Sequence, residues 1–167
     1  ILFFNLFKFY TNTNPHKNEY YEKLITFFSA LVLFGVTTFA QVNISGANPS
    51  TNGNYSTLKA AFDAINATDQ TNYDVVIQLS ASITDNNTAT LNAGAWNSLE
   101  IYPTNAGVVI SGNVAAPMID INGASKATID GRVNKSGSTK SLVIQNTSNS
   151  TASNEISTIR FINGVRD

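Results

Sequence analysis

The stretch Val75-Val76-Ile77-Gln78-Leu79 is a short run of β-branched and apolar residues, and the runs that follow it repeat this composition. Each run is short, and Gly, Asn or Pro separates nearly all of them. Because such residues favour turns, every run predicts one short β-strand. The six later runs cover residues 99–102, 108–110, 118–121, 127–130, 142–144 and 159–162.

Isoleucines recur within these runs at a spacing that is typical of repeated structure. Ile77, Ile101, Ile121 and Ile144 follow one another at similar intervals, and Ile110 and Ile129 form an offset pair with a comparable interval. A recurrence of about 20–25 residues with several short strands per unit predicts a solenoidal sheet whose successive turns share one core. An antiparallel sandwich, with strands every 8–12 residues or so, is the alternative that the spacing leaves open.

One amphipathic helix is expected before the strands. Leu58, Ala61, Phe62 and Ile65 fall at i, i+3, i+4 and i+7 and form a single apolar stripe. Ser56 or Thr57 would cap its first amides, and residues 41–54 before it predict an extended lead-in. A helix laid across the first turn would cover an unpaired sheet edge and an open apolar core.

Three stretches resemble parts of a known family. Residues 55–65 resemble the helix that caps right-handed parallel β-helix proteins such as pectinesterases and pectate lyases, and residues 127–131 and 157–164 are similar to single rungs. The stretch from about Asn43 to Val165 is similar to the front of large surface β-helix proteins of Bacteroidetes-type bacteria. The resemblance implies an all-β fold, in which residues 55–167 supply a capping helix and the first few rungs of a β-helix domain truncated at its C-terminus.

An export signal is expected before the lead-in. Residues 24–36 form an apolar run, Lys23 precedes it, and Ala40 follows it as a small residue that a signal peptidase reads. This predicts a signal peptide over residues 23–40, cleavage between Ala40 and Gln41, and a secreted or cell-surface protein without membrane contact after cleavage. The alternative is a membrane anchor, although the apolar part is shorter than the roughly 20 residues that a spanning helix needs. Residues 1–22 are interpreted as an upstream or non-native extension.

The composition argues against several kinds of chemistry. The chain has no cysteine, and its single histidine, His16, precedes the expected cleavage site. The mature part therefore offers neither a Ser-His-Asp triad nor a zinc site built on His or Cys, and we expect no cofactor and no metal. The formal net charge of −1 gives no basic footprint for nucleic acid.

Asp120, Asp130 and Arg132 are the candidate ligand-binding residues, and no catalytic residue is assigned. The two carboxylates lie on neighbouring predicted strands, and Arg132 lies just beyond Asp130. Such a pair could serve acid–base work on a polysaccharide or bind Ca²⁺. The alternative is that both face outward at strand ends, with Asp130-Gly131 forming a turn.

The aromatic residues Tyr73, Trp96 and Tyr102 also have two interpretations. They could form a sugar-stacking surface, or they could pack beneath a loop expected over residues 86–97.

These patterns favour a non-catalytic segment of a secreted or surface protein, acting in adhesion or in contact with a polysaccharide or cell-surface glycan. The alternative function is the N-terminal part of a polysaccharide lyase, esterase or glycoside hydrolase whose active site lies beyond Asp167.

Overall fold

A computed structural model of the chain describes residues 41–151 and 155–164. The expected extension, residues 1–22, and the expected signal peptide, residues 23–40, lie outside the described residues. The described part is mostly β-structure with one α-helix. None of the helical segments among these residues could span a membrane.

The secondary structure consists of short strands around a single helical segment. In chain order the elements are β1 (Val42–Ser45), β2 (Gly53–Tyr55), α3 (Leu58–Asn66), β3 (Asp74–Leu79), β4 (Ile83–Thr84), β5 (Ala89–Asn92), β6 (Ser98–Pro103), β7 (Val109–Gly112), β8 (Pro117–Asn122), β9 (Ala127–Ile129), the 3₁₀ turn η2 (Val133–Lys135), β10 (Val143–Asn146) and β11 (Ser157–Ile162).

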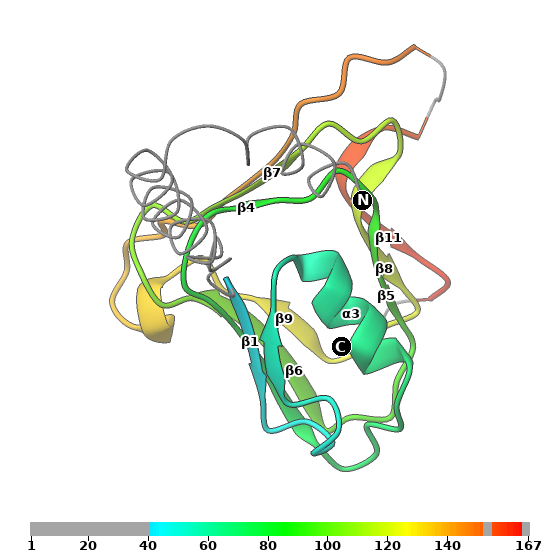
Figure 1. Cartoon of the computed structure of the whole chain (residues 1–167), viewed down its shortest axis with the longest axis vertical. Helices are drawn as coiled ribbons and strands as arrows, with labels where there is room; N and C mark the ends of the chain where they lie inside the picture. Colours follow the sequence, from blue (N-terminus) through cyan, green and yellow to red (C-terminus); the bar gives the residue numbers. More distant parts are fainter. Residues whose placement is uncertain (1–40, 152–154, 165–167) are drawn as a thin grey trace, which may run out of the picture. The chain divides into compact units, whose positions relative to one another are not determined.

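The strands form three sheets, which lie on three sides of the core in Figure 1. Their strand orders are β2-β1-β3-β6-β9, β4-β7-β10 and β5-β8-β11. β1 runs antiparallel to β2 and β3, whereas all other pairings between these strands are parallel. Such pairing does not fit the antiparallel sandwich that the spacing left open.

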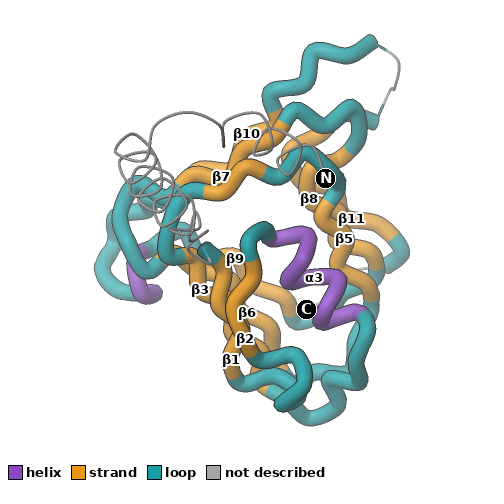
Figure 2. Tube along the Cα trace, viewed as in Figure 1, coloured by secondary structure: helices purple, strands orange, loops and turns teal. Residues whose placement is uncertain are grey.

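Three consecutive strands make one circuit, a term used here for one strand in each sheet. The circuits are β3-β4-β5, β6-β7-β8 and β9-β10-β11. Within each sheet the corresponding strands of successive circuits lie next to one another (Figure 2). Inward-facing residues align from circuit to circuit, so that the circuits share one core. The aligned sets are Ile77, Ile101 and Ile129; Ile83, Ile110 and Ile144; and Leu91 with Ile121.

The isoleucine spacing predicts that successive isoleucines align in neighbouring turns, and this prediction is right for one pair and wrong for the others. Ile77 and Ile101 are direct neighbours in one sheet, as the spacing predicts. Ile121 and Ile144, however, belong to the other two sheets. The loops between strands differ in length, so that Ile110 lies much further along the chain from its partner Ile144 than Ile77 does from Ile101. A single period cannot describe circuits that lengthen along the chain.

α3 packs against β5, β1 and β2 at one end of the core. Its apolar stripe is buried, and Phe62 is 0% exposed. Thr57 is the N-cap, and its Oγ1 accepts a hydrogen bond from the Ala60 N–H at 3.0 Å. At the other end Asn66 donates to the Thr90 carbonyl and accepts from the Asn92 N–H. The helix thereby occupies backbone groups along β5 that would otherwise form an open edge.

Two stretches that were expected to lack strands contain them. Residues 41–54, expected as an extended lead-in, contain β1 and most of β2, and Val42 and Ile44 of β1 are buried. The loop expected over residues 86–97 contains β5, in which Ala89 and Leu91 are buried. Strands β1 and β5 each bury only two apolar residues, which alternate with polar ones. Because Asn and Thr residues surround them, this alternation of apolar and polar residues is too weak to predict a strand.

Candidate functional site

The structure separates the two candidate carboxylates. Asp120 lies in β8 of the β5-β8-β11 sheet, whereas Asp130 directly follows β9 in the five-stranded sheet. Strands β8 and β9 are consecutive along the chain but belong to different sheets. The interpretation of Asp120 and Asp130 as neighbours is therefore wrong, and each carboxylate has an arginine of its own.

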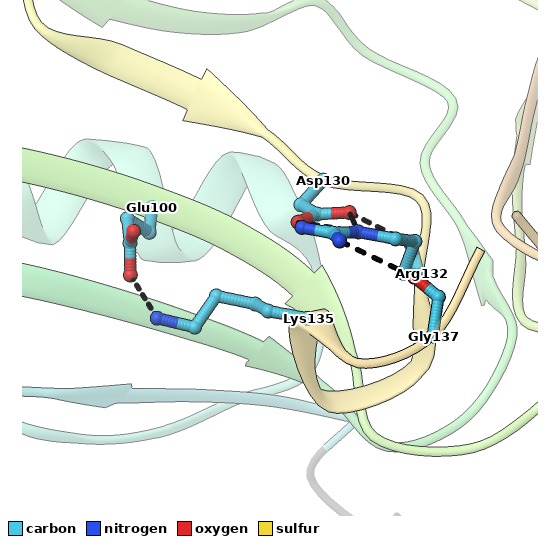
Figure 3. Close-up of polar contacts among 5 residues, drawn as sticks. All are labelled: Glu100, Asp130, Arg132, Lys135 and Gly137. Carbon is cyan, nitrogen blue, oxygen red and sulfur yellow. Dashed lines mark hydrogen bonds and ion pairs between the residues drawn. The ribbon is translucent and has the colours of Figure 1, made fainter.

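Asp130 and Arg132 form a two-pronged ion pair, drawn in Figure 3. Arg132 Nε donates to Asp130 Oδ1 at 3.0 Å, and Nη2 donates to Oδ2 at 2.6 Å. The Arg132 backbone N–H also donates to Asp130 Oδ1, and Nη1 donates to the Gly137 carbonyl. The hydrogen bonds from Arg132 lower the pKa of Asp130 from 3.8 to about 2. At neutral pH this carboxylate is charged and is paired with Arg132.

Replacing Asp130 with asparagine is expected to flatten the acid dependence of stability. Because the folded-state pKa lies below the unfolded value of 3.8, the ion pair stabilises the fold above that pH and loses its contribution as the pH falls toward 2. Urea unfolding between about pH 5 and pH 2 should therefore show a smaller loss for Asp130→Asn than for the wild type. Equal losses in both proteins would contradict the assigned pKa shift.

Asp120 faces outward on β8 but is only 6% exposed, because Arg160 of β11 covers it. Arg160 Nε donates to Asp120 Oδ1 at 3.1 Å, and Nη2 donates to Oδ2 at 2.8 Å. Arg160 also pairs with Glu155. One guanidinium thus joins two carboxylates and links adjacent strands of a sheet.

A further polar group, here called the outer cluster, consists of Gln78, Glu100, Tyr102 and Lys135. Lys135 Nζ lies 2.6 Å from Glu100 Oε2 and 5.3 Å from the centre of the Tyr102 ring. Gln78 Nε2 donates to the Tyr102 hydroxyl at 3.0 Å. The cluster is absent from the sequence-based expectations. The register that aligns β3 with β6 also places Gln78 beside Tyr102, but nothing local indicates that Lys135 folds back onto them.

The aromatic residues do not form an exposed stacking surface. Trp96 is 3% exposed, and its Nε1 donates to the Ser125 carbonyl at 2.8 Å. Tyr102 is 9% exposed and Tyr73 is partly buried against the core. Packing is therefore the correct interpretation for Trp96.

Asp85 is a buried carboxylate that the sequence did not single out. It is 4% exposed, and its Oδ2 accepts the Lys59 backbone N–H at 2.8 Å, in the first turn of α3. Burial raises the pKa of Asp85, and the hydrogen bond from the Lys59 backbone opposes that shift. This carboxylate ties the first circuit to the helix that covers it.

Other carboxylates of the described residues are also engaged. Asp63 binds Lys59, Asp69 accepts from Thr71, and Asp74 accepts from the Ser98 hydroxyl. Across residues 41–151 and 155–164, no group of three or more His, Cys, Asp or Glu side chains is placed to hold a metal ion.

An exposed line of asparagines, here called the amide ladder, crosses the circuits where β5, β8 and β11 end. Asn122 Nδ2 donates to Asn92 Oδ1 at 2.8 Å, and Asn163 Nδ2 donates to Asn122 Oδ1. Each side chain is thereby held in one orientation, with amide groups at the surface.

No family model matches the chain, and no curated protein or solved structure matches it either. The chemistry of the outer surface is therefore the basis for a functional proposal.

Proposed function

We propose that this chain forms the first rungs of a right-handed parallel β-helix in a secreted or cell-surface protein, and that it contacts glycans without catalysing a reaction. Parallel circuits that return to the same three sheets support the β-helix, as does α3 over one end of the core. The right hand follows from the strong general preference of parallel crossovers. Export is proposed from the charged, apolar and small-residue order of residues 23–40.

The partnering of the carboxylates supports a non-catalytic role. Acid–base work on a polysaccharide needs two carboxyl groups flanking one bond, at separations of roughly 5–10 Å. In the described residues Asp120 and Asp130 lie in different sheets, and each is bound by an arginine. Asp120 and Glu155 do share one place, but both are bound by the same guanidinium, that of Arg160.

The amide ladder is the observation that carries the proposed glycan contact. Amide side chains donate and accept hydrogen bonds at once, as sugar hydroxyls do. Asn92, Asn122 and Asn163 present such groups in a fixed line on the exposed surface. They carry no charge, so a neutral glycan is the chemistry that fits them.

The full chain, exported and purified, should bind at least one soluble neutral polysaccharide in affinity gel electrophoresis. The exported protein should begin at Gln41, and no new reducing ends should appear in the polysaccharide. Asn122→Ala removes the middle of the amide ladder and should weaken binding several-fold. Asn105→Ala is the matched control, because Asn105 is an exposed asparagine that binds the Ser80 carbonyl elsewhere on the surface.

Two results would refute the proposal. Unretarded migration in every neutral polysaccharide would remove the glycan contact, and release of reducing ends would replace the non-catalytic role with an enzymatic one.

A further inference from the structure

Residues 130–140, here called the strap, fold back across the outer face of β6. Figure 3 shows Arg132 and Lys135 of the strap beside the sheet. Lys135 pairs with Glu100 of β6, Asn134 Nδ2 donates to the Thr104 carbonyl, and Arg132 forms a β-bridge with Lys140 that closes the strap on itself.

The strap covers an aromatic ring that faces away from the core. Leu99 and Ile101 of β6 point inward, so Glu100 and Tyr102 lie on the outer side. Glu100 keeps 35% of its side chain exposed, but Tyr102 is only 9% exposed. Lys135 lies over the Tyr102 ring, and Gln78 holds its hydroxyl.

Polar contacts hold this strap, and its backbone is strained. η2 has no buried residue, and the Lys135–Glu100 pair is exposed to solvent at both side chains. Exposed ion pairs contribute little to stability and weaken with salt. Asn134 and Lys135 have φ of 49° and 57°, and a lysine rarely adopts such a conformation. Backbone strain of this kind is typical of segments that change conformation.

We propose that the strap opens, and that the Tyr102 ring, with Gln78 and Glu100 beside it, then binds a neutral sugar ring. This inference rests on the proposed glycan contact and adds a second binding surface to it. The ring face stacks against sugar C–H groups, while the Gln78 amide and the Glu100 carboxylate bind hydroxyls. Moving Lys135 away leaves the Glu100 carboxylate beside the ring, which repels an anionic sugar and selects a neutral one.

The first test measures access to Tyr102. Nitration of the full chain with tetranitromethane, followed by peptide mass spectrometry, should label Tyr102 several-fold faster in Lys135→Met than in the wild type. Added salt should also speed the labelling of the wild type. Lys126→Met is the matched control, because Lys126 has a φ of 56° and lies outside the strap. Equal labelling of Tyr102 in Lys135→Met and wild type would overturn the proposal.

The second test measures binding by affinity electrophoresis in neutral polysaccharide. Lys135→Met should bind several-fold more tightly than the wild type, and the added Tyr102→Leu change should abolish this gain. Circular dichroism of each variant confirms that it is folded. If the wild type binds but Lys135→Met brings no gain, or the gain survives Tyr102→Leu, the strap inference fails and the proposed function stands. If neither protein binds, both fail, and a gain seen only with acidic polysaccharide overturns the neutral specificity.

Discussion

Replacing Phe62 with alanine is expected to lower the free energy of unfolding by about 3–5 kcal/mol. Phe62 is the largest fully buried side chain of the described residues, and it lies in the apolar stripe of α3. Its loss would leave a cavity between the helix and the strands that it covers, and the packed surroundings can fill that cavity only in part. Urea unfolding followed by circular dichroism measures the effect.

Phe161 supplies the matched control. It is also a phenylalanine, but in β11, and it is 63% exposed. Phe161→Ala should cost only about 0.5 kcal/mol, as for most surface substitutions. A loss for Phe62→Ala as small as that for Phe161→Ala would mean that α3 does not seal the core.

Gly112→Ala is expected to destabilise the fold by about 3 kcal/mol through a steric conflict. A Cβ at Gly112 would lie 1.9 Å from the carbonyl oxygen of Asp85 in the preceding circuit. Neither backbone can move away freely. The Asp85 N–H binds the Ser111 carbonyl at 2.8 Å, and the Thr147 N–H binds the Gly112 carbonyl at 2.7 Å. The need for glycine at position 112 therefore follows from the close approach of two successive circuits.

Gly131→Ala is the control for this substitution. A Cβ at Gly131 would meet its nearest neighbour, Lys140 Cβ, at 3.4 Å, an ordinary contact distance. Its stability should stay within about 0.5 kcal/mol of the wild type, since no atom must shift. Thermal or urea unfolding of the two alanine variants compares them directly, and equal stabilities would show that the circuits are further apart than the structure places them.

Local patterns in the sequence were sufficient to locate the helix and most strands. The stripe from Leu58 to Ile65 and the cap expected at Ser56 or Thr57 depend on neighbours within one or two helical turns. α3 confirms the stripe, and its N-cap is Thr57. Runs such as 75–79 coincide with strands because β-branched residues and flanking turns act locally. β1 escaped prediction because its core role depends on pairing with β3, which lies beyond both β2 and α3 along the chain.

The polar contacts of the site could not be predicted for a related reason. Asp120 and Arg160 are distant in sequence, and the register of β8 with β11 brings them together. That register depends on which residues of the two strands face the core, and because the strands are far apart in the chain, no short-range signal reveals it. The pair of Asp130 and Arg132 differs from this case, because the two residues are close in sequence. Even so, the sequence did not show that they form an ion pair with each other.

The parallel register of the circuits is the central claim, and a disulfide tests it most directly. The chain has no cysteine of its own, and Ser111 of β7 aligns with Gln145 of β10. Partners on adjacent strands lie about 5 Å apart, within the range that a disulfide spans. Ser111→Cys with Gln145→Cys should therefore form an intramolecular disulfide on mild oxidation, seen by non-reducing peptide mapping. Ser111→Cys with Thr128→Cys, in different sheets, should form none. Cross-linking of the aligned pair no greater than that of the control would contradict the parallel circuits.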